Sequence, residues 1–414
     1  MRRTRSLSAI VRRLPVWTAL AVFVASLPAT TYAQRDKYAE ARETMVADYL
    51  IREGISNQAV LKSIRSVPRH QFVSPQWRPA AYYDQALPIG HKQTISPPFI
   101  VAYMTEMIDP QPDDVVLEIG TGSGYQAAVL SSLVKEVYTI EIVEPLGKNA
   151  AKVLKELKYE NVFPKIGDGY LGWEEHAPFD KIIVTCSPES VPKPLVDQLR
   201  EGGKMIIPLG ERYEQVFYLL EKQNGELVKK KLLPALFVPM TGVSEDNRQV
   251  KPDPARPEVH NGGFEDDEDG DGHPDGWHYQ RQLTRETVDA PEGHAFVTFE
   301  NHDAGRGAMA LQGMAVDGGK VGSLQVSLRV RGKDLRFGQG GLEKPSLTVQ
   351  FYDADRKPLD AIVIGPWQGT FDWKRASKLV HVPPKAREAI LRVGLNGGTG
   401  VLSVDDIEMK VLPR

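Results

Sequence analysis

Between residues 110 and 208 the sequence alternates short apolar runs with amphipathic segments, and this alternation constrains the fold more than any other feature. The alternation is typical of a mainly parallel sheet with helices on both of its faces. The runs 215–221 and 227–233 flank Asn224-Gly225, a dipeptide that favours a tight turn, so we expect a β-hairpin to end this half. The predicted strands are 114–120, 136–142, 162–166, 181–185 and 204–208, and the predicted helices are 125–134, 145–157 and 192–199.

Beyond residue 258 the helical patterns almost disappear. Short runs that alternate or cluster apolar residues are separated by Gly and Pro, as in an all-β sandwich. A chain of 414 residues also exceeds the usual size of a single hydrophobic core. We therefore expect two folded domains, the second a jelly-roll-like β-sandwich. Its predicted strands are 295–299, 323–330, 346–352, 361–364, 378–382, 389–393 and 401–404.

The N-terminus has the order of a secretory signal. Five arginines precede an apolar run at 14–27, and small residues follow up to Ala33. We expect export to the periplasm or the medium, with an uncleaved anchor and a cytoplasmic protein as the alternatives. No other segment is apolar enough to span a membrane. The predicted division is a signal peptide at 1–33, an α/β domain at 34–245, a linker rich in proline and charge at 246–258, and the sandwich at 259–414.

Basic and acidic residues nearly balance, so the chain has no strong electrostatic field of one sign. The chain carries 51 basic and 54 acidic residues, so nothing in its net charge of −3 indicates a nucleic-acid partner. It has a single cysteine, Cys186, which excludes an intrachain disulfide.

A glycine-rich turn is the strongest local indication of a ligand site. Gly120, Gly122 and Gly124, with Thr121 between the first two, follow the first predicted strand and open a helix, while Glu118 lies just before them. Glycines let the backbone pass close to a ligand, and a helix N-terminus offers free N–H groups. The spacing differs from that of dinucleotide sites. Read alone, the turn fits a nucleotide-like ligand or a tight turn made for packing.

Two carboxylates at later strand ends strengthen the ligand interpretation. Glu141 ends the second predicted strand, where a carboxylate can accept both ribose hydroxyls. Asp168 and Gly169 follow the third strand, where a carboxylate and backbone amides can meet an adenine edge. Because the carboxyl ends of parallel strands share one edge of the sheet, we expect these groups to lie together.

Several segments together resemble the protein-L-isoaspartate O-methyltransferase family. The resemblance covers about residues 37–242, and the motif Gln93-Thr94-Ile95-Ser96 is its most specific part. Cys186 and Ser187 depart from the family, which usually has alanines there. The matching segments are 69–73 (RHQFV), 86–98 (ALPIGHKQTISPP), 116–126 (VLEIGTGSGYQ), 167–173 (GDGYLGW), 177–185 (APFDKIIVT) and 202–208 (GGKMIIP).

The resemblance implies a class I, Rossmann-like fold that binds S-adenosyl-L-methionine and methylates the α-carboxylate of L-isoaspartyl residues in damaged proteins. It implies that Ser96 is the catalytic residue and that Gln93, Thr94 and Ile95 border donor and substrate. The implied donor-binding residues are Glu118, Gly120, Thr121, Gly122, Gly124, Glu141, Asp168 and Gly169. An exported enzyme of this kind needs its donor outside the cytoplasm, and the sequence does not explain that supply.

The second half carries an acidic loop with alternating carboxylates. Asp267, Asp269 and Asp271, with Asp275 as a further ligand, can surround a hard cation such as Ca²⁺. Counted from Asp267, the twelfth position is His278, so the bidentate glutamate that ends an EF-hand loop is missing. The pattern looks more like the calcium loops of thrombospondin type 3 repeats. A solvated acidic turn is the alternative.

Other motifs of the second half resemble carbohydrate-binding-module-like jelly rolls. Trp277, Tyr279, Trp367 and Trp373 are candidates for stacking on sugar rings, although filling the sandwich core is the more common role of such residues.

Two further readings of the whole chain remain at this point. An exported binding protein with a degenerate methyltransferase domain is disfavoured by the intact glycine turn, by Glu141 and by Ser96. A methyltransferase for another carboxylate substrate is disfavoured by the motif from Gln93 to Ser96.

Overall fold

A computed structural model describes residues 37–341 and 343–414, and residues 40–414 form one compact unit. The predicted signal peptide at 1–33 lies outside the described residues. Within the described ranges no helix combines the length and the apolar character that a membrane span requires.

The α/β half begins with helices that pack on one another. Asn57 caps α2, since its side chain accepts hydrogen bonds from the amides of Ala59 and Val60. The helices of the described residues are α1 Ala39–Thr44, the π-helix η1 Met45–Ile51, α2 Gln58–Ser66, the 3₁₀ helices η2 Arg69–Gln71 and η3 Pro75–Ala80, α3 Pro98–Met107, α4 Tyr125–Ser131, α5 Glu144–Glu156, η4 Gly169–Leu171, η5 Glu174–His176, α6 Lys193–Gln198 and α7 Val243–Asp246.

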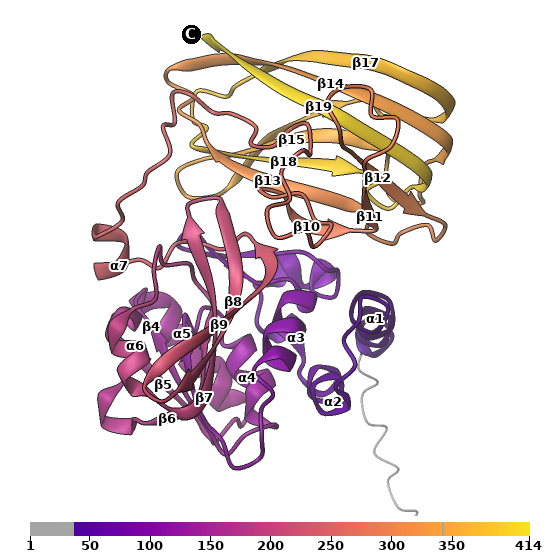
Figure 1. The fold of residues 1–414 in the computed structure, drawn as a ribbon. Coiled ribbons are helices and arrows are strands. Elements are labelled where there is room, and N and C mark those ends of the chain that lie inside the picture. The colour runs from indigo at the N-terminus through magenta and orange to yellow at the C-terminus, as the bar shows by residue number, and fades with distance from the viewer. Residues whose placement is uncertain (1–36, 342) are drawn as a thin grey trace, which may run out of the picture. The chain divides into compact units, whose positions relative to one another are not determined.

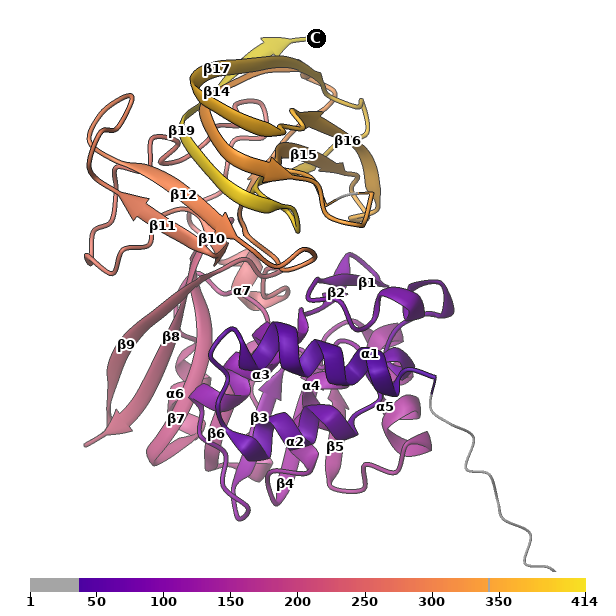
Figure 2. The same cartoon turned by 90° about the vertical axis from the view of Figure 1, so that its right-hand side faces the viewer.

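A seven-stranded sheet with the order β5-β4-β3-β6-β7-β8-β9 forms the centre of this half, with helices on both faces (Figures 1 and 2). Strands β3 to β7 pair in parallel, while β8 and β9 add the predicted hairpin in antiparallel fashion. A separate small hairpin pairs β1 with β2. The strands are β1 Leu87–Gly90, β2 Gln93–Ile95, β3 Val115–Ile119, β4 Glu136–Glu141, β5 Val162–Ile166, β6 Phe179–Val184, β7 Leu199–Glu211, β8 Glu214–Gln223 and β9 Glu226–Ala235.

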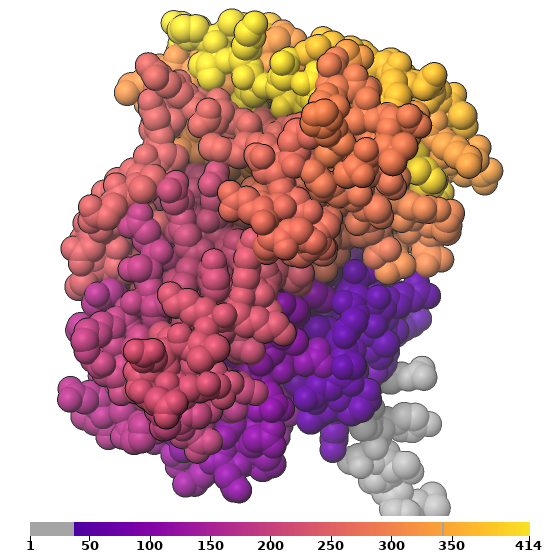
Figure 3. Space-filling model, viewed as in Figure 1, coloured from indigo at the N-terminus to yellow at the C-terminus, as the bar shows by residue number. Residues whose placement is uncertain are grey.

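The C-terminal half is a jelly-roll-like β-sandwich, and its residues gather in one continuous region of the surface (Figure 3). Its two antiparallel sheets have the orders β10-β13-β18-β15-β16 and β11-β12-β19-β14-β17, and they enclose one apolar core. The strands are β10 His278–Arg281, β11 Leu283–Glu286, β12 Phe296–Asn301, β13 Met309–Ala315, β14 Val321–Arg336, β15 Ser346–Tyr352, β16 Pro358–Ile364, β17 Gly369–His381, β18 Glu388–Gly394 and β19 Thr399–Pro413.

Strands β10, β11 and β13 were not expected from the sequence. The two first strands are only four residues long, and glutamine and arginine break their apolar pattern. Two of the four aromatic residues considered for sugar binding fill the sandwich core instead, since Trp277 is fully buried and Trp367 is 6% exposed. Trp373 packs edge-on against Phe296. These rings therefore fill the sandwich or pack on it and do not form an open sugar platform.

The segment predicted as a linker is tied to the α/β half at its start. The side chain of Arg248 is buried and donates to the backbone oxygens of Ser187 and Gly210, and it pairs with Glu245. The amides of Gln249 and Val250 donate to Glu189. Residues 249–258 contain no helix or strand, as their proline and charge indicate.

Candidate active site

Two segments far apart in sequence line one cavity at the carboxyl edge of the parallel strands. The first is the end of the β1–β2 hairpin, which contributes Gln93, Thr94, Ile95 and Ser96. The second is the glycine turn between β3 and α4, together with the strand ends at Glu141 and Thr185. The structure thus brings the predicted catalytic segment and most of the predicted donor site into one cavity.

The glycine turn has a backbone that only glycine adopts easily. Gly120, Gly122 and Gly124 have φ angles of +98°, +54° and +89°. A Cβ at Gly120 would lie 2.5 Å from Oγ1 of Thr185, which in turn donates to the carbonyl of Gly120 at 2.8 Å. The turn is therefore held against β6, with the amide-rich start of α4 beside the cavity.

Glu118 is a buried acid with one free oxygen. Its Oε2 accepts a hydrogen bond from Thr139 at 2.6 Å, while Oε1 has no partner among the described residues. Burial raises the pKa of Glu118 to about 8, and the charge of Glu141 adds to the shift. A buried, unpaired acceptor at the wall of a cavity indicates a ligand group that supplies the missing hydrogen bond.

Glu141 joins the strand end to the glycine turn. Its Oε2 accepts from the amide of Gly122 at 2.7 Å and its Oε1 accepts from the amide of Val143 at 2.8 Å. Each carboxylate oxygen keeps a second lone pair, so both can still accept a ribose hydroxyl as the sequence predicts. Burial raises the pKa of Glu141, against the opposing effect of these amides.

Asp168 follows β5 as expected, but its carboxylate is already bonded to the backbone. Its Oδ1 accepts from the amide of Tyr170, and its Oδ2 accepts from the amide of Val243 at 2.9 Å. Gly169 lines the cavity, whereas Asp168 does not. The carboxylate therefore ties the turn after β5 to the first residue of α7, and its role toward an adenine stays a prediction. Thr121 lines the cavity as predicted, with its hydroxyl bonded to that of Thr139.

Ser96 is held from behind by a buried arginine. Nη2 of Arg69 donates to the carbonyl of Ser96 at 2.7 Å, and Nε donates to the carbonyl of Ala81 at 2.8 Å. Arg69 is fully buried and lies 4.7 Å from the ring centre of Tyr125. The Ser96 hydroxyl makes no hydrogen bond within the part of the chain that the structure describes, so it is available to a substrate.

Several cavity residues were not identified from the sequence. Gln126 lines the cavity with a buried Oε1 that lacks a partner in the described ranges, and Met240 also lines it. Thr185 ends a parallel strand, which is the same indication that identified Glu141. Arg69 and Met240 carry no comparable indication. Cys186 also lines the cavity, and burial raises the pKa of its thiol beyond the neutral range, so it is a wall residue rather than a nucleophile.

These residues fit the donor that the resemblance implies. The turn would hold the amino-acid part of S-adenosylmethionine, the Glu141 carboxylate its ribose, and the free Oε1 of Glu118 a further polar group. The positive φ angles of the three glycines, and the 2.5 Å that would separate a Cβ at Gly120 from Oγ1 of Thr185, exclude side chains from the turn.

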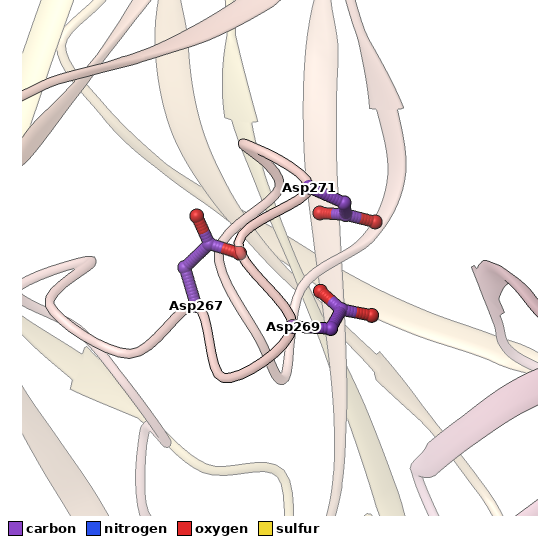
Figure 4. A group of neighbouring side chains, drawn as sticks. All are labelled: Asp267, Asp269 and Asp271. Carbon is purple, nitrogen blue, oxygen red and sulfur yellow. The ribbon is translucent and has the colours of Figure 1, made fainter.

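The acidic loop before β10 brings three carboxylates together. Asp267, Asp269 and Asp271 project from one irregular loop, and one oxygen of each lies within 4.8 Å of the others (Figure 4). Lys231 of β9 lies among them, 2.7 Å from Oδ2 of Asp269 and 3.6 Å from Oδ1 of Asp275. The predicted ligands are thus gathered, and a cation on the protein already pairs with two of them.

Comparisons with known proteins identify the family of the α/β half. The family model of protein-L-isoaspartate(D-aspartate) O-methyltransferase matches residues 41–245. A protein-L-isoaspartate O-methyltransferase of Opitutus terrae is 54% identical over 48% of this chain and 86% of its own length, and one of Gloeobacter violaceus is 52% identical over 48% and 97%. A solved protein-L-isoaspartate O-methyltransferase is 30% identical, with a TM-score of 0.45 over 49% of this chain and 67% of its own. The chain therefore belongs to the protein-L-isoaspartate O-methyltransferase family.

Proposed function

We propose that this chain transfers a methyl group from S-adenosyl-L-methionine to the α-carboxylate of L-isoaspartyl residues in damaged proteins. The observation that carries the proposal is that the segment Gln93–Ser96 and the glycine turn line one cavity. Family membership supports the same donor and acceptor. The reaction forms a bond between a carboxylate oxygen and the methyl carbon, breaks the bond from that carbon to sulfur, and releases the uncharged thioether.

The residues of this chain act mainly by alignment. S-adenosylmethionine, when bound, supplies an electrophilic methyl group on a sulfonium sulfur. A carboxylate is already ionised at neutral pH, so the site needs no general base. The hydroxyl of Ser96 is free to donate to the substrate carboxylate and to orient one oxygen toward the donor side of the cavity. Orientation of this kind is worth several kcal/mol, up to about 10 in the best cases.

The proposal is tested by following labelled methyl transfer to an isoaspartyl peptide and to the same peptide with a normal aspartyl residue. We expect base-labile labelling of the isoaspartyl peptide alone. Ser96→Ala should lower the rate by about 100-fold, in the range found when one positioning hydrogen bond to a reacting group is removed. Donor affinity should not change, because Ser96 contacts the acceptor.

Ser74→Ala is the matched control, since Ser74 is exposed and also precedes a proline. It should keep the wild-type rate. Equal labelling of both peptides would contradict isoaspartyl selectivity. Donor binding without any labelling would indicate another carboxylate substrate, and absence of donor binding would leave a binding protein on a methyltransferase fold.

We also propose that the chain is exported. The support is the order of arginines, apolar run and small residues at 1–33. Cell fractionation with N-terminal sequencing should find a mature chain that begins near Gln34 outside the cytoplasm. Val22→Asp, which interrupts the apolar run, should retain the uncleaved chain inside. A cytoplasmic chain that begins at Met1 in the wild type would contradict export.

A calcium site in the acidic loop is a second proposal. Beside the three gathered carboxylates, the Asp267 side chain is 10% exposed and its Oδ1 is buried without a partner among the described residues. A divalent cation would supply that partner. It would also compete with Lys231 for Asp269 and Asp275. We therefore expect weak binding, with a dissociation constant of about 10⁻⁴ to 10⁻³ M, as in extracellular modules.

Calorimetric titration with Ca²⁺ and with Mg²⁺ tests this proposal. We expect binding of Ca²⁺ that disappears in the double variant Asp269→Asn with Asp271→Asn. Asp355→Asn, at an exposed acid of another loop, should bind as the wild type does. If millimolar Ca²⁺ produces neither heat nor a rise in melting temperature, the loop is a solvated turn.

A further inference from the structure

The carboxylate of Asp84 joins the predicted catalytic segment to the β-sandwich. Its Oδ1 accepts a hydrogen bond from the amide of Phe99, in the first turn of α3 and three residues after Ser96. Its Oδ2 accepts from the hydroxyl of Tyr279 in β10 at 2.6 Å. Asp84 therefore has one oxygen on the first turn of α3, directly after the catalytic segment, and the other on the accessory domain.

A neighbouring strand residue adds charge to this contact. Arg281 has its guanidinium 3.6 Å from the ring centre of Phe99 and 4.6 Å from that of Tyr279. Burial raises the pKa of Asp84, and the positive charge of Arg281 opposes that rise more than any other group does. Arg281 thus helps to keep the carboxylate ionised, and an ionised carboxylate makes the stronger hydrogen bond to the Phe99 amide.

The segments 81–84 and 96–99 are joined at both ends. Arg69 connects the carbonyls of Ala81 and Ser96, and Asp84 reaches the amide of Phe99. The first connection lies wholly inside the family's part of the chain. The second also lies there, but its carboxylate is bonded to Tyr279 and stabilised by the charge of Arg281, and these two residues lie beyond residue 245, where the family match ends.

We propose that Tyr279 and Arg281 are positioning residues for methyl transfer, which act through Asp84 to hold the segment from Ser96 to Phe99 in place. The inference rests on the proposed function and assigns the β-sandwich a part in the acceptor side of that site. Among the described residues, neither Tyr279 nor Arg281 makes a hydrogen bond or an ion pair with the glycine turn, which is held by Thr185 and Glu141. The two residues should therefore affect the acceptor and leave donor binding unchanged.

Steady-state kinetics with an isoaspartyl peptide, and titration with S-adenosylhomocysteine, test the inference on the full chain. Tyr279→Phe removes one hydroxyl and Arg281→Gln one charge. Each should lower kcat/KM for the peptide by about tenfold, since displacement of a reacting group by a fraction of an ångström is costly. Affinity for S-adenosylhomocysteine should stay within about twofold of wild type. Arg281→Lys should recover only part of the loss, because it restores the charge but not the planar group that lies over the rings of Phe99 and Tyr279.

Asp303→Asn is the matched control, because Asp303 pairs with Arg52 across the same two halves without contacting Asp84. It should leave kcat/KM unchanged. Hydrogen exchange of the amides of Ser96 and of residues 99–107 provides a readout that does not depend on activity, and we expect faster exchange there in Tyr279→Phe. Unchanged kinetics and exchange in both variants would overturn the inference. So would an equal loss of peptide turnover and donor affinity, because that is the result of general destabilisation. An inactive wild type with the expected exchange would contradict only the proposed function.

Discussion

The two sides of the cavity are built in different ways. On the donor side, the glycine turn, Glu141 and Thr185 lie at successive strand ends of one sheet and hold one another through backbone contacts. On the acceptor side, Ser96 follows a small hairpin that is separate from that sheet, and it is held by Arg69 and, through Asp84, by the sandwich. The difference teaches that donor binding depends on local geometry, while placement of the acceptor depends on buried polar contacts between distant segments.

The largest expected effect comes from the buried arginine of the acceptor side. Arg69→Met would leave the carbonyls of Ala81 and Ser96 without their donor, and the free energy of unfolding should fall by about 4 kcal/mol, since each buried carbonyl left without a partner costs about 1–3 kcal/mol. Urea unfolding measures this loss. Arg65→Met, at a partly exposed arginine, is the control.

The comparison also predicts that the folded fraction of Arg69→Met keeps its affinity for S-adenosylhomocysteine while turnover of the isoaspartyl peptide falls. If donor affinity and turnover fell together, the two sides of the cavity would not be independent.

The donor side has its own decisive position at Gly120. In Gly120→Ala the new Cβ would lie 2.5 Å from Oγ1 of Thr185, so the turn must move away from β6. We expect affinity for S-adenosylhomocysteine to fall by about 100-fold, equal to about 3 kcal/mol. Calorimetric titration measures it.

Gly54→Ala separates this contact from backbone strain. Gly54 has the same φ of +98°, and a Cβ there meets nothing within 4 Å. It should cost about 1 kcal/mol of stability for the left-handed backbone and leave donor affinity unchanged. Equal donor affinity in the two alanine variants would show that the contact with Thr185 does not determine the turn.

The sequence predicted most of the donor side because its signals are local. A buried strand followed by glycines, and an acid at the next strand end, place the turn and Glu141 without knowledge of distant segments. The same rule was incomplete for Asp168, whose position after β5 was correct but whose carboxylate is bonded to the backbone of Val243. A strand-end rule cannot foresee a later segment that returns to the same acid.

The acceptor side was identified only through the family motif, and its supports were not predicted. Nothing near Asp84 in sequence indicates that its partner is a tyrosine 195 residues later. Strand β10, which carries Tyr279, has no clear apolar alternation and was missed for that reason. Contacts between distant polar residues follow from the packed fold, and neither propensity nor periodicity records them.

A buried histidine next to Tyr279 in β10 makes the stability of the protein depend on pH. His278 is 2% exposed, and burial lowers its pKa to about 4 from 6.5, although its bond to the carbonyl of Tyr213 opposes the shift. The unfolded chain therefore takes up the proton first as the pH falls below 6.5. Stability that is complete above pH 6.5 is lost progressively down to pH 4, by about 2 kcal/mol between pH 7 and pH 5.

His278→Gln keeps a donor for the Tyr213 carbonyl and removes the titration, so its urea midpoint should change less over this pH interval. His302→Gln, at a side chain that is 77% exposed, should behave as the wild type does. A wild type and a His278→Gln variant with the same pH dependence would exclude His278 as the source.

The smallest change in stability is expected for the ion pair between the acidic loop and β9. Its size shows how much a partly exposed ion pair contributes to holding the two halves together. The side chains of Lys231 and Asp269 are 33% and 35% exposed, so solvent screens their ion pair. Lys231→Gln should change the free energy of unfolding by less than about 1 kcal/mol, and less still in concentrated salt. Thermal unfolding at low and high salt measures this. A loss as large as that of Arg69→Met would mean that partly exposed pairs, and not the buried acceptor-side contacts, hold the sandwich in place.

If the acidic loop binds Ca²⁺, the same variant should bind it more tightly, because the ammonium group no longer competes for Asp269 and Asp275.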